Sequence, residues 1–334
     1  MLNPELHLRE DLFEPKEKAP TRDGFGRGAV EAGKVDPRIV VLSADLAEST
    51  RAEWFQKEFP TRFIEMGVAE QNMATVAAGM ANYGKIPFIT SYAAFSPGRN
   101  WEQIRTTIAL NNVPVIVCGM HAGVSVGPDG ATHQMLEDIA IMRAMPNMIV
   151  LSPCDAEEAR KATVEAAIAH RPIYMRFGRE KTPVMTTSET PFELGKINVF
   201  WNPPAGGDSP LVAIFATGPL LHNALLAARE LEGVGMHVTV ANVSCIKPID
   251  QATVLELAQA ARAVVTVEEH QTTGGLFGAI SEVLAQEFPT PIQPVGVRDQ
   301  FGQSGTMQEL VEHYGMGVSY IVAAVKTVIT KKIS

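Results

Sequence analysis

Glu70 is the residue of this sequence whose surroundings most favour chemistry. It follows a short strand and a glycine turn within residues 62–73, and residues 71–84 after it carry no charged side chain. The helix expected at 72–83 is small and apolar on every side, which predicts a helix that is buried all round. A carboxyl group in such dry surroundings either offsets the helix dipole as a first-turn residue or shares a proton with a ring nitrogen of a bound heterocycle.

A second group of candidates lies in the loop from 121 to 134, where His121, Asp129 and His133 are separated by glycines. Two histidines and an aspartate could hold a metal ion, but no further ligand with suitable spacing is near, so we expect no metal site. A loop histidine is otherwise a structural hydrogen-bonding residue or a substrate contact. Tyr92 and Phe95 follow another apolar strand, and aromatic residues there either fill the core or pack on a flat ligand.

The elements that must position these residues alternate between strand and helix patterns along most of the chain. Such alternation implies parallel βαβ connections and sheets covered on both faces. Turn-forming residues interrupt it between 184 and 210. We therefore predict an α/β fold of two doubly wound domains. The segments are an N-terminal arm at 1–20, a first domain at 21–185, a linker at 186–210 and a smaller second domain at 211–334.

Ligands of such sheets bind at the carboxyl ends of the strands. In this sequence those ends carry Asp45, Glu70, Tyr92, His121 and Arg179. The arm, by contrast, carries leucines scattered among charged residues. We expect it either to fray or to place its leucines on a partner chain.

Composition limits the classes of function. The chain has 334 residues, 46% hydrophobic and 19% charged, with a net charge of -9 and no basic cluster, which argues against nucleic acid as the main partner. No apolar run is long enough to span a membrane, and the N-terminus lacks the apolar core of a signal peptide. The three cysteines lie far apart without the spacing of a zinc or redox motif, so a reducing, cytoplasmic location is expected.

Five stretches, taken together and in this order, resemble transketolase, the thiamine-diphosphate enzyme that moves a two-carbon ketol unit. They are Ser43-Ala44-Asp45-Leu46, Gly67-Val68-Ala69-Glu70-Gln71-Asn72-Met73, Tyr92-Ala93-Ala94-Phe95, Asp129-Gly130-Ala131-Thr132-His133-Gln134 and Met142-Arg143-Ala144-Met145-Pro146-Asn147-Met148. The resemblance covers about residues 20–330. It implies a pyrimidine-binding domain followed by the smaller C-terminal domain of that family.

The family's diphosphate-binding domain has no counterpart in this sequence. The chain thus resembles the C-terminal subunit of split transketolases, whose two halves assemble as an α2β2 heterotetramer with a homodimeric core. The resemblance implies that an N-terminal partner subunit supplies the diphosphate side of the thiamine diphosphate site and binds the Mg or Ca ion. It also implies sugar phosphates as substrates and a place in pentose phosphate metabolism.

Residue by residue, the resemblance assigns Glu70 to the aminopyrimidine ring as a catalytic residue, with Tyr92 and Phe95 packed on that ring and Asp45 approaching the cofactor from the sheet edge. His133 is assigned to catalysis and, with Asp129, to the C1 and C2 hydroxyls of the sugar. The phosphate end of the substrate is assigned to His121, Arg22, Ser49 and Arg179, although Arg176 and Lys181 are close alternatives for the last cation. A one-residue extension around 96–98 leaves the family's third aromatic unmatched.

Three other readings compete with this one. The β subunit of a 2-oxoacid dehydrogenase first component shares the two domains, but its usual His-Ser-Gln is Thr132-His133-Gln134 here. A 1-deoxyxylulose-5-phosphate synthase fragment would also lack its first domain. A non-catalytic structural subunit is disfavoured because Glu70, Asp129 and His133 are all present.

Overall fold

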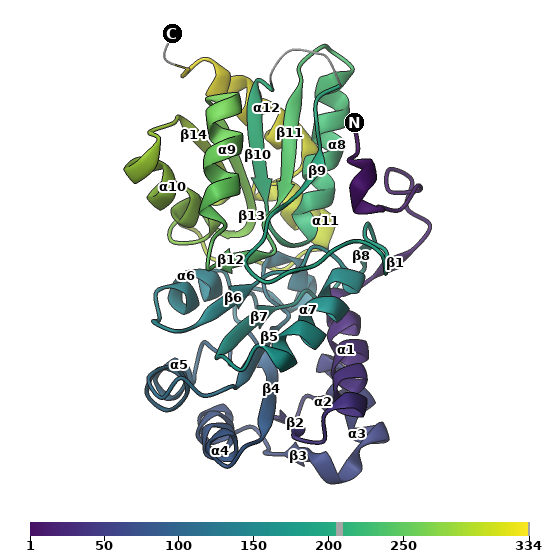
Figure 1. Ribbon diagram of the computed structural model, residues 1–334, viewed down its shortest axis with the longest axis vertical. Coiled ribbons are helices and arrows are strands. Elements are labelled where there is room, and N and C mark those ends of the chain that lie inside the picture. The colour runs from purple at the N-terminus through teal and green to yellow at the C-terminus, as the bar shows by residue number, and fades with distance from the viewer. Residues whose placement is uncertain (205–209, 333–334) are drawn as a thin grey trace.

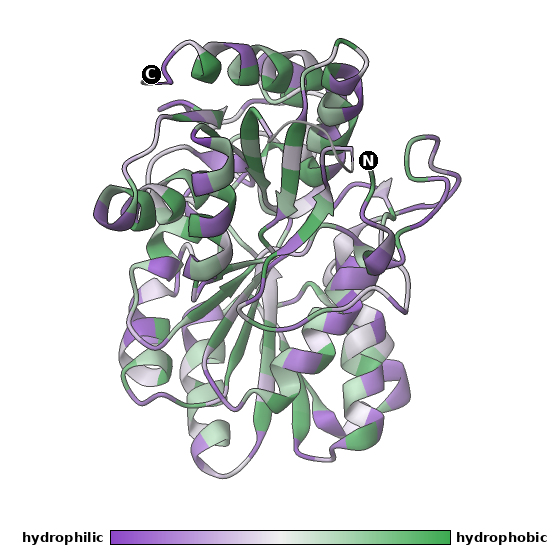
Figure 2. Ribbon diagram, turned by 45° about the horizontal axis from the view of Figure 1, so that its top comes forward, coloured by the Kyte–Doolittle hydropathy of each residue, from purple (hydrophilic) through white to green (hydrophobic). Residues whose placement is uncertain are grey.

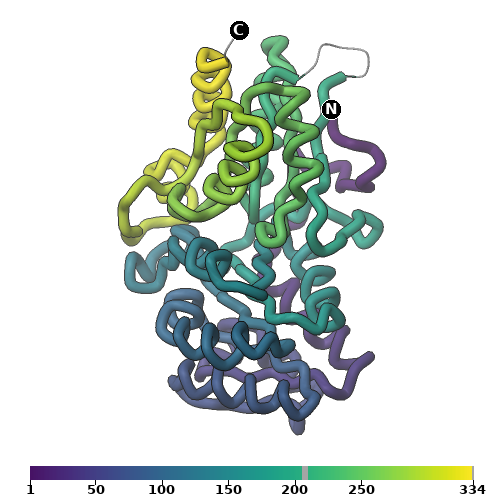
Figure 3. Tube along the Cα trace, turned by 60° about the vertical axis from the view of Figure 1, so that its left-hand side comes forward, coloured from purple at the N-terminus to yellow at the C-terminus, as the bar shows by residue number. Residues whose placement is uncertain are grey.

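The computed structural model describes residues 1–204 and 210–332. It has two α/β units stacked along the long axis of the molecule, each with its own sheet and with helices on both faces (Figures 1 and 3). This confirms the predicted fold class. Residues 205–209 of the expected linker lie outside the described residues. None of the helices within the described ranges has the length and apolar character needed to cross a membrane.

The sheet of the first unit has seven strands in the order β12-β6-β7-β5-β4-β2-β3. Six are parallel: β2 (Ile39–Ser43), β3 (Phe63–Glu65), β4 (Ile86–Tyr92), β5 (Ile116–Met120), β6 (Ile149–Leu151) and β7 (Ile173–Arg176). The seventh, β12 (Cys245–Lys247), returns from the second half of the chain and pairs with β6 antiparallel. The central strands are almost entirely apolar because helices cover both of their faces, as Figure 2 shows by hydropathy.

The helices of the first unit divide between two apolar clusters, one on each face of the sheet. One cluster contains residues of α1 (Thr21–Val35), α3 (Ala52–Glu58) and α7 (Ala156–Ile168). The other contains residues of α4 (Glu70–Asn82), η3 (Ile104–Ala109) and α6 (Asp138–Arg143), with α5 (Trp101–Gln103) beside them. Helices α1 and α7 approach closely because Gly24 has no side chain, and a Cβ there would lie 2.1 Å from the carbonyl oxygen of Ala156.

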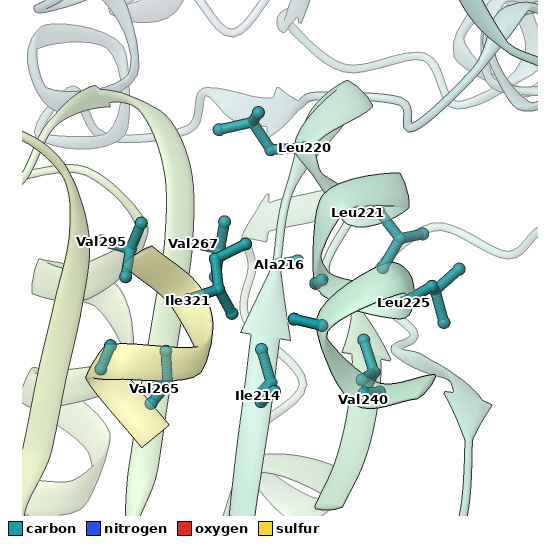
Figure 4. Close-up of a cluster of buried hydrophobic side chains, with 14 of the residues drawn as sticks. Ile214, Ala216, Leu220, Leu221, Leu225, Val240, Val265, Val267, Val295 and Ile321 are labelled. Carbon is teal, nitrogen blue, oxygen red and sulfur yellow. The ribbon is translucent and has the colours of Figure 1, made fainter. Parts of the chain in front are cut away.

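The second unit has a five-stranded sheet in the order β14-β13-β10-β11-β9. Its strands are β9 (Asn198–Trp201), β10 (Val212–Ala216), β11 (Val238–Asn242), β13 (Val264–Gln271) and β14 (Ile292–Val297), and only β9 runs antiparallel to its neighbour. Helices α8 (Leu221–Glu232), α11 (Met307–His313) and α12 (Val318–Ile329) share one core cluster. Figure 4 shows part of this cluster, where Ile321 of α12 and Leu225 of α8 lie on either side of Ile214 and Ala216 of β10. Helices α9 (Gln251–Ala261) and α10 (Leu276–Glu287) cover the other face.

The N-terminal arm is packed on its own chain, so the expectation that it frays or lies on a partner is wrong. Leu6 and Leu12 are buried in the core cluster of the second unit, and Leu2 forms a bridge to Trp201 of β9. The end of the arm forms β1 (Lys18–Ala19), which pairs antiparallel with β8 (Thr182–Pro183). The scattered leucines cover the edge of the second unit beside β9, where Figure 1 places the N-terminus.

Helix α4 is buried on one face only, which corrects the prediction of a helix buried all round. Met73, Ala74 and Ala77 face the sheet, whereas Gln71, Asn72, Thr75 and Gly79 are exposed. Tyr83, directly after the helix, is 93% exposed, and Val68, just before it, is 69% exposed. The small residues that suggested burial on every side therefore leave an uncovered face in this chain.

Candidate functional site

Glu70 begins helix α4, and its side chain is almost completely buried at 1% exposure. The turn before it needs Gly67, whose φ of +68° is in the left-handed region that favours glycine. The Ser91 hydroxyl donates to Oε1 of Glu70 at 3.3 Å, and Nη1 of Arg99 donates to Oε2 at 2.8 Å. The buried carboxylate is thus held between the end of β4 and the segment that follows it, and its charge is balanced by an arginine that is 49% exposed.

Four rings form an aromatic platform beside this carboxylate: Tyr92, Phe95, His121 and His133. The Tyr92 ring stacks on His121 with centroids 4.0 Å apart and on Phe95 with centroids 5.9 Å apart. His133 meets Phe95 edge-on at 5.5 Å. The guanidinium of Arg99 lies 5.0 Å from the centre of the Phe95 ring, so Arg99 contacts both Glu70 and the platform.

An arginine cavity of about 580 Å³ adjoins the platform. The residues lining it are Arg22, Asp45, Leu46, Ala47, Glu48, Ser49, Arg51, Glu65 and Arg179. The Ser49 hydroxyl shares a hydrogen bond of 2.7 Å with the Tyr92 hydroxyl, which joins the cavity to the platform. Asp45 sits at the end of β2, where its backbone N–H donates to Oε1 of Glu65 at 2.7 Å. The cavity thus contains three guanidinium groups and three carboxyl groups, and Arg51 and Arg179 are ion-paired with Asp23 and Asp129. An anionic ligand would meet the guanidinium groups, of which Arg22 has no ion-pair partner among the described residues.

His121 is neutral at this place for a clear physical reason. Burial, followed by the nearby Arg22 charge, lowers its pKa from 6.5 to about 3. Nη1 of Arg22 donates to Nε2 of His121 at 3.2 Å, so in the neutral ring the proton is assigned to Nδ1. Two buried nitrogen atoms, Nδ1 of His121 and Nε of Arg22, have no hydrogen-bond partner among the described residues. Both are donors that a bound acceptor would satisfy.

Asp129 and His133 lie in the same 121–134 loop. Nη1 of Arg179 donates to Oδ1 of Asp129 at 3.1 Å and to the carbonyl oxygen of Val126 at 3.1 Å. His133 joins the loop to the platform through its contacts with Phe95 and Tyr92. The loop therefore connects the aromatic platform to one of the three arginines of the cavity.

The structure brings nearly all of the predicted site residues into one region. The platform, the cavity and the 121–134 loop together contain Arg22, Asp45, Ser49, Tyr92, Phe95, His121, Asp129, His133 and Arg179. Glu70 does not line the cavity, and its link to this region runs through Arg99 and Phe95. Of the alternative cations, Arg176 is buried in an ion pair with Asp138 at 2.8 Å and Lys181 is exposed, which leaves Arg179 facing the cavity.

Two residues of the site were missed by the sequence analysis. Arg51 lines the cavity, with its Nε 2.7 Å from Oδ1 of Asp23. Arg99 was overlooked within the extended 96–99 segment, although its position four residues after Phe95 is a spacing at which one helical turn brings a cation onto a ring.

Comparison with known proteins identifies the two domains of the chain. Residues 17–185 match the transketolase pyrimidine-binding domain, and residues 207–321 match the transketolase C-terminal domain. The putative transketolase C-terminal section of Methanocaldococcus jannaschii is 41% identical over 88% of this chain and 92% of its own length. The 6-deoxy-6-sulfo-D-fructose transketolase subunit SqwH of a Clostridium species is 38% identical over 93% of this chain and 95% of its own.

A solved structure described as a split gene transketolase, inactive beta4 tetramer, superposes with a TM-score of 0.86 at 42% identity, covering 94% of this chain and 99% of that one. Relatives of nearly the same length therefore share both the sequence and the two-unit fold. The chain belongs to the transketolase family, of which it carries the pyrimidine-binding and C-terminal domains.

Proposed function

We propose that this chain is one subunit of a thiamine-diphosphate-dependent transketolase, which transfers a two-carbon ketol unit from a ketose phosphate to an aldose phosphate. The observation that carries the proposal is the arrangement of three features side by side: the buried Glu70 carboxylate, the aromatic platform, and a cavity with three arginines. The first two suit a flat nitrogen heterocycle, and the third suits an anionic substrate.

The residues around Glu70 fit the pyrimidine ring of that cofactor. Arg99 is a planar, nitrogen-bearing group that donates to Glu70 and lies over Phe95. An aminopyrimidine would make the same two interactions. We therefore infer that, in the chain without cofactor, Arg99 fills the position that the pyrimidine ring would take. When bound, thiamine diphosphate supplies the carbon nucleophile that accepts the ketol unit. Glu70 would share a proton with a ring nitrogen of the pyrimidine, and Phe95 and Tyr92 would hold the flat face of the ring.

The sugar would lie along the 121–134 loop. We assign Asp129 and His133 to its first hydroxyls. We assign its anionic end to Arg22, Ser49, His121 and Arg179. A neutral His121 would suit this role because its Nδ1–H, a buried donor without a partner among the described residues, could donate a hydrogen bond to an anion oxygen that reached it. The sulfofructose named for the Clostridium relative also ends in an anionic group, so these residues alone do not choose between phosphate and sulfonate.

The second side of the site would come from another chain. We propose an N-terminal transketolase subunit that binds the diphosphate and its Mg or Ca ion, in an α2β2 assembly. Support comes from the relative described as a C-terminal section and from the solved structure described as a split gene product. The uncovered face of α4, with Val68 and Tyr83 at its two ends, offers a surface for such an assembly.

The test is reconstitution. The partner is sought as a neighbouring reading frame that encodes Gly-Asp-Gly and a downstream Asn. Each chain and their mixture are then assayed with a ketose phosphate donor and an aldose phosphate acceptor in the presence of thiamine diphosphate and Mg²⁺. We expect ketol transfer by the mixture and none by either chain. Turnover by the isolated chain, or a mixture that decarboxylates 2-oxoacids instead, would contradict the proposal.

A further inference from the structure

The 121–134 loop lies directly on the second unit of the chain, although its functional residues point to the first. Val124 of the loop is buried in the core cluster of the second unit, together with Leu136 just beyond the loop. The short helix η4 (Val124–Asp129) also packs against α11 of that unit. The second unit therefore supports the loop along one side.

Hydrogen bonds also fix the loop to the second unit. Oε1 of Glu269, on β13, accepts the backbone N–H of Ser125 at 2.6 Å. Nε2 of Gln134 donates to the carbonyl oxygens of Val124, at 3.0 Å, and of Gln303, at 2.9 Å, and thereby ties both ends of the loop to the 301–305 segment. The two Gln134 bonds are neutral, whereas the Glu269 bond involves a carboxylate, and hydrogen bonds to a charged group are stronger than neutral ones.

The contact leaves no room for a Cβ at Gly123 and Gly130, and at Gly127 a Cβ would lie a tight 3.2 Å from the carbonyl oxygen of Gly305. Gly123, Gly127 and Gly130 all have positive φ, and each lies against the second unit. A Cβ on Gly123 would be 2.3 Å from Oε1 of Glu269. The carboxylate of Glu269 can reach the loop backbone because Gly123 leaves that space open.

The backbone of Glu269 is itself held by a buried ion pair between Arg176 and Asp138. Nη2 of Arg176 donates to the Glu269 carbonyl oxygen at 2.7 Å, and Nε of Arg176 donates to Asp138 at 2.8 Å. Burial raises the pKa of Glu269, while the Arg176 charge opposes that shift. Glu269 is 3% exposed and lies outside the set of residues assigned to cofactor or substrate.

We propose that Glu269 is a positioning residue: by holding the Ser125 amide it sets the course of the loop, and so the places of Asp129 and His133. In this way the C-terminal domain contributes to substrate binding without touching the substrate. The link between loop shape and sugar binding rests on the proposed function above, whereas the link between Glu269 and loop shape does not.

The first measurement therefore needs no activity. Hydrogen exchange of the Ser125 amide is followed in the full chain for wild type, Glu269→Ala and Glu269→Gln. Loss of a hydrogen bond to a charged group should speed this exchange by about 10-fold or more in Glu269→Ala. Glu269→Gln, whose amide oxygen can still accept, should show a smaller increase.

Glu268→Ala is the matched control, because Glu268 is the neighbouring buried carboxylate of β13 and accepts the backbone N–H groups of Leu276 and Phe277 instead. It should leave Ser125 exchange as in wild type even where it lowers the melting temperature. Unchanged Ser125 exchange in Glu269→Ala, or equal changes in both alanine variants, would overturn the proposal, and so would a Gln variant that behaves like Ala.

The second measurement uses the reconstituted enzyme. Glu269→Ala should raise the KM for the ketose phosphate by about 10-fold, following the loss of loop order, with thiamine diphosphate affinity as in wild type. Glu269→Gln should restore most of the KM. A lowered cofactor affinity with an unchanged KM would overturn the positioning role. If wild type shows no ketol transfer, the proposed function fails while the exchange result still decides whether Glu269 shapes the loop.

Discussion

Replacing Arg99 with methionine tests whether this arginine holds the place of the cofactor ring or binds the cofactor. In the free chain its guanidinium is bonded to Glu70 at 2.8 Å and covers Phe95. If a pyrimidine binds Glu70 as proposed, we expect it to displace Arg99, because the ring would occupy the space that Arg99 fills between Glu70 and Phe95. The Arg99→Met change therefore removes a contact that exists in the free chain and is already lost in the bound state.

The magnitude follows from the burial of the two partners. Glu70 is 1% exposed and Arg99 is 49% exposed. A hydrogen bond to a charged group contributes about 1.5–3 kcal/mol when buried, but solvent at the arginine brings the pair toward the surface value, so we assign about 1 kcal/mol. The free chain should lose about that much free energy of unfolding. Since the bound state is unaffected, thiamine diphosphate should bind about 5-fold more tightly to the reconstituted enzyme.

The assay combines urea unfolding of the isolated chain with calorimetric titration of thiamine diphosphate into the reconstituted enzyme. Arg105→Met is the control, because Arg105 is an exposed arginine of the following helix and the substitution changes the net charge equally. It should alter neither quantity. Weaker binding of the cofactor by Arg99→Met would refute the reasoning and make Arg99 a cofactor ligand.

Four further substitutions probe the rest of the site. Glu70→Gln in the reconstituted enzyme should leave folding and assembly near normal and slow deuterium exchange at C2 of the cofactor by about 10²-fold, because an amide cannot share the proton; unchanged exchange with a lowered melting temperature would make Glu70 a structural residue. Asp129→Asn and His133→Ala should each lower kcat/KM for the ketose phosphate by about 10- to 100-fold while calorimetry shows unchanged cofactor binding, and loss of cofactor binding would contradict the assignment of the loop. His121 has a folded-state pKa of about 3 against 6.5 for a free histidine, so the unfolded chain takes up the proton first and stability falls as the pH drops below 6.5. Between pH 7 and pH 5 the wild-type chain should lose about 2 kcal/mol of its free energy of unfolding through this group. Urea unfolding at the two pH values should therefore show a smaller loss in His121→Gln than in wild type. Equal losses in the two proteins would contradict a buried neutral ring.

The strand ends could be predicted from the sequence because local pattern determines them. Asp45, Tyr92 and His121 each follow an apolar run, and parallel strands bring their carboxyl ends to one edge, which is where the structure places them. The two α/β units could be predicted for the same reason. The roles assigned to these residues in catalysis and binding stay predictions.

Contacts between distant segments could not be predicted in this way. Nothing local to Leu6 and Leu12 shows that they complete the core of the second unit, since the segments they contact are far along the chain. Glu269 meets Ser125 across a sequence separation of 144 residues, and only the folded chain brings them together. The face of α4 was misjudged because small residues are equally suited to a buried helix and to a helix that another surface covers.

The uncovered face of α4 also affects the stability of the free chain and its resistance to proteolysis. Tyr83 is 93% exposed and Val68 is 69% exposed, so in the free chain both residues that flank helix α4 are in contact with water. Anything that binds the native fold and covers such a surface raises its stability by mass action, so the melting temperature of the free chain should rise with its own concentration if copies pair. A copy made in excess of its partner lacks that support and is more open to unfolding and proteolysis. Balanced synthesis of the two halves would then be enforced by removal of the surplus as well as by control of the genes.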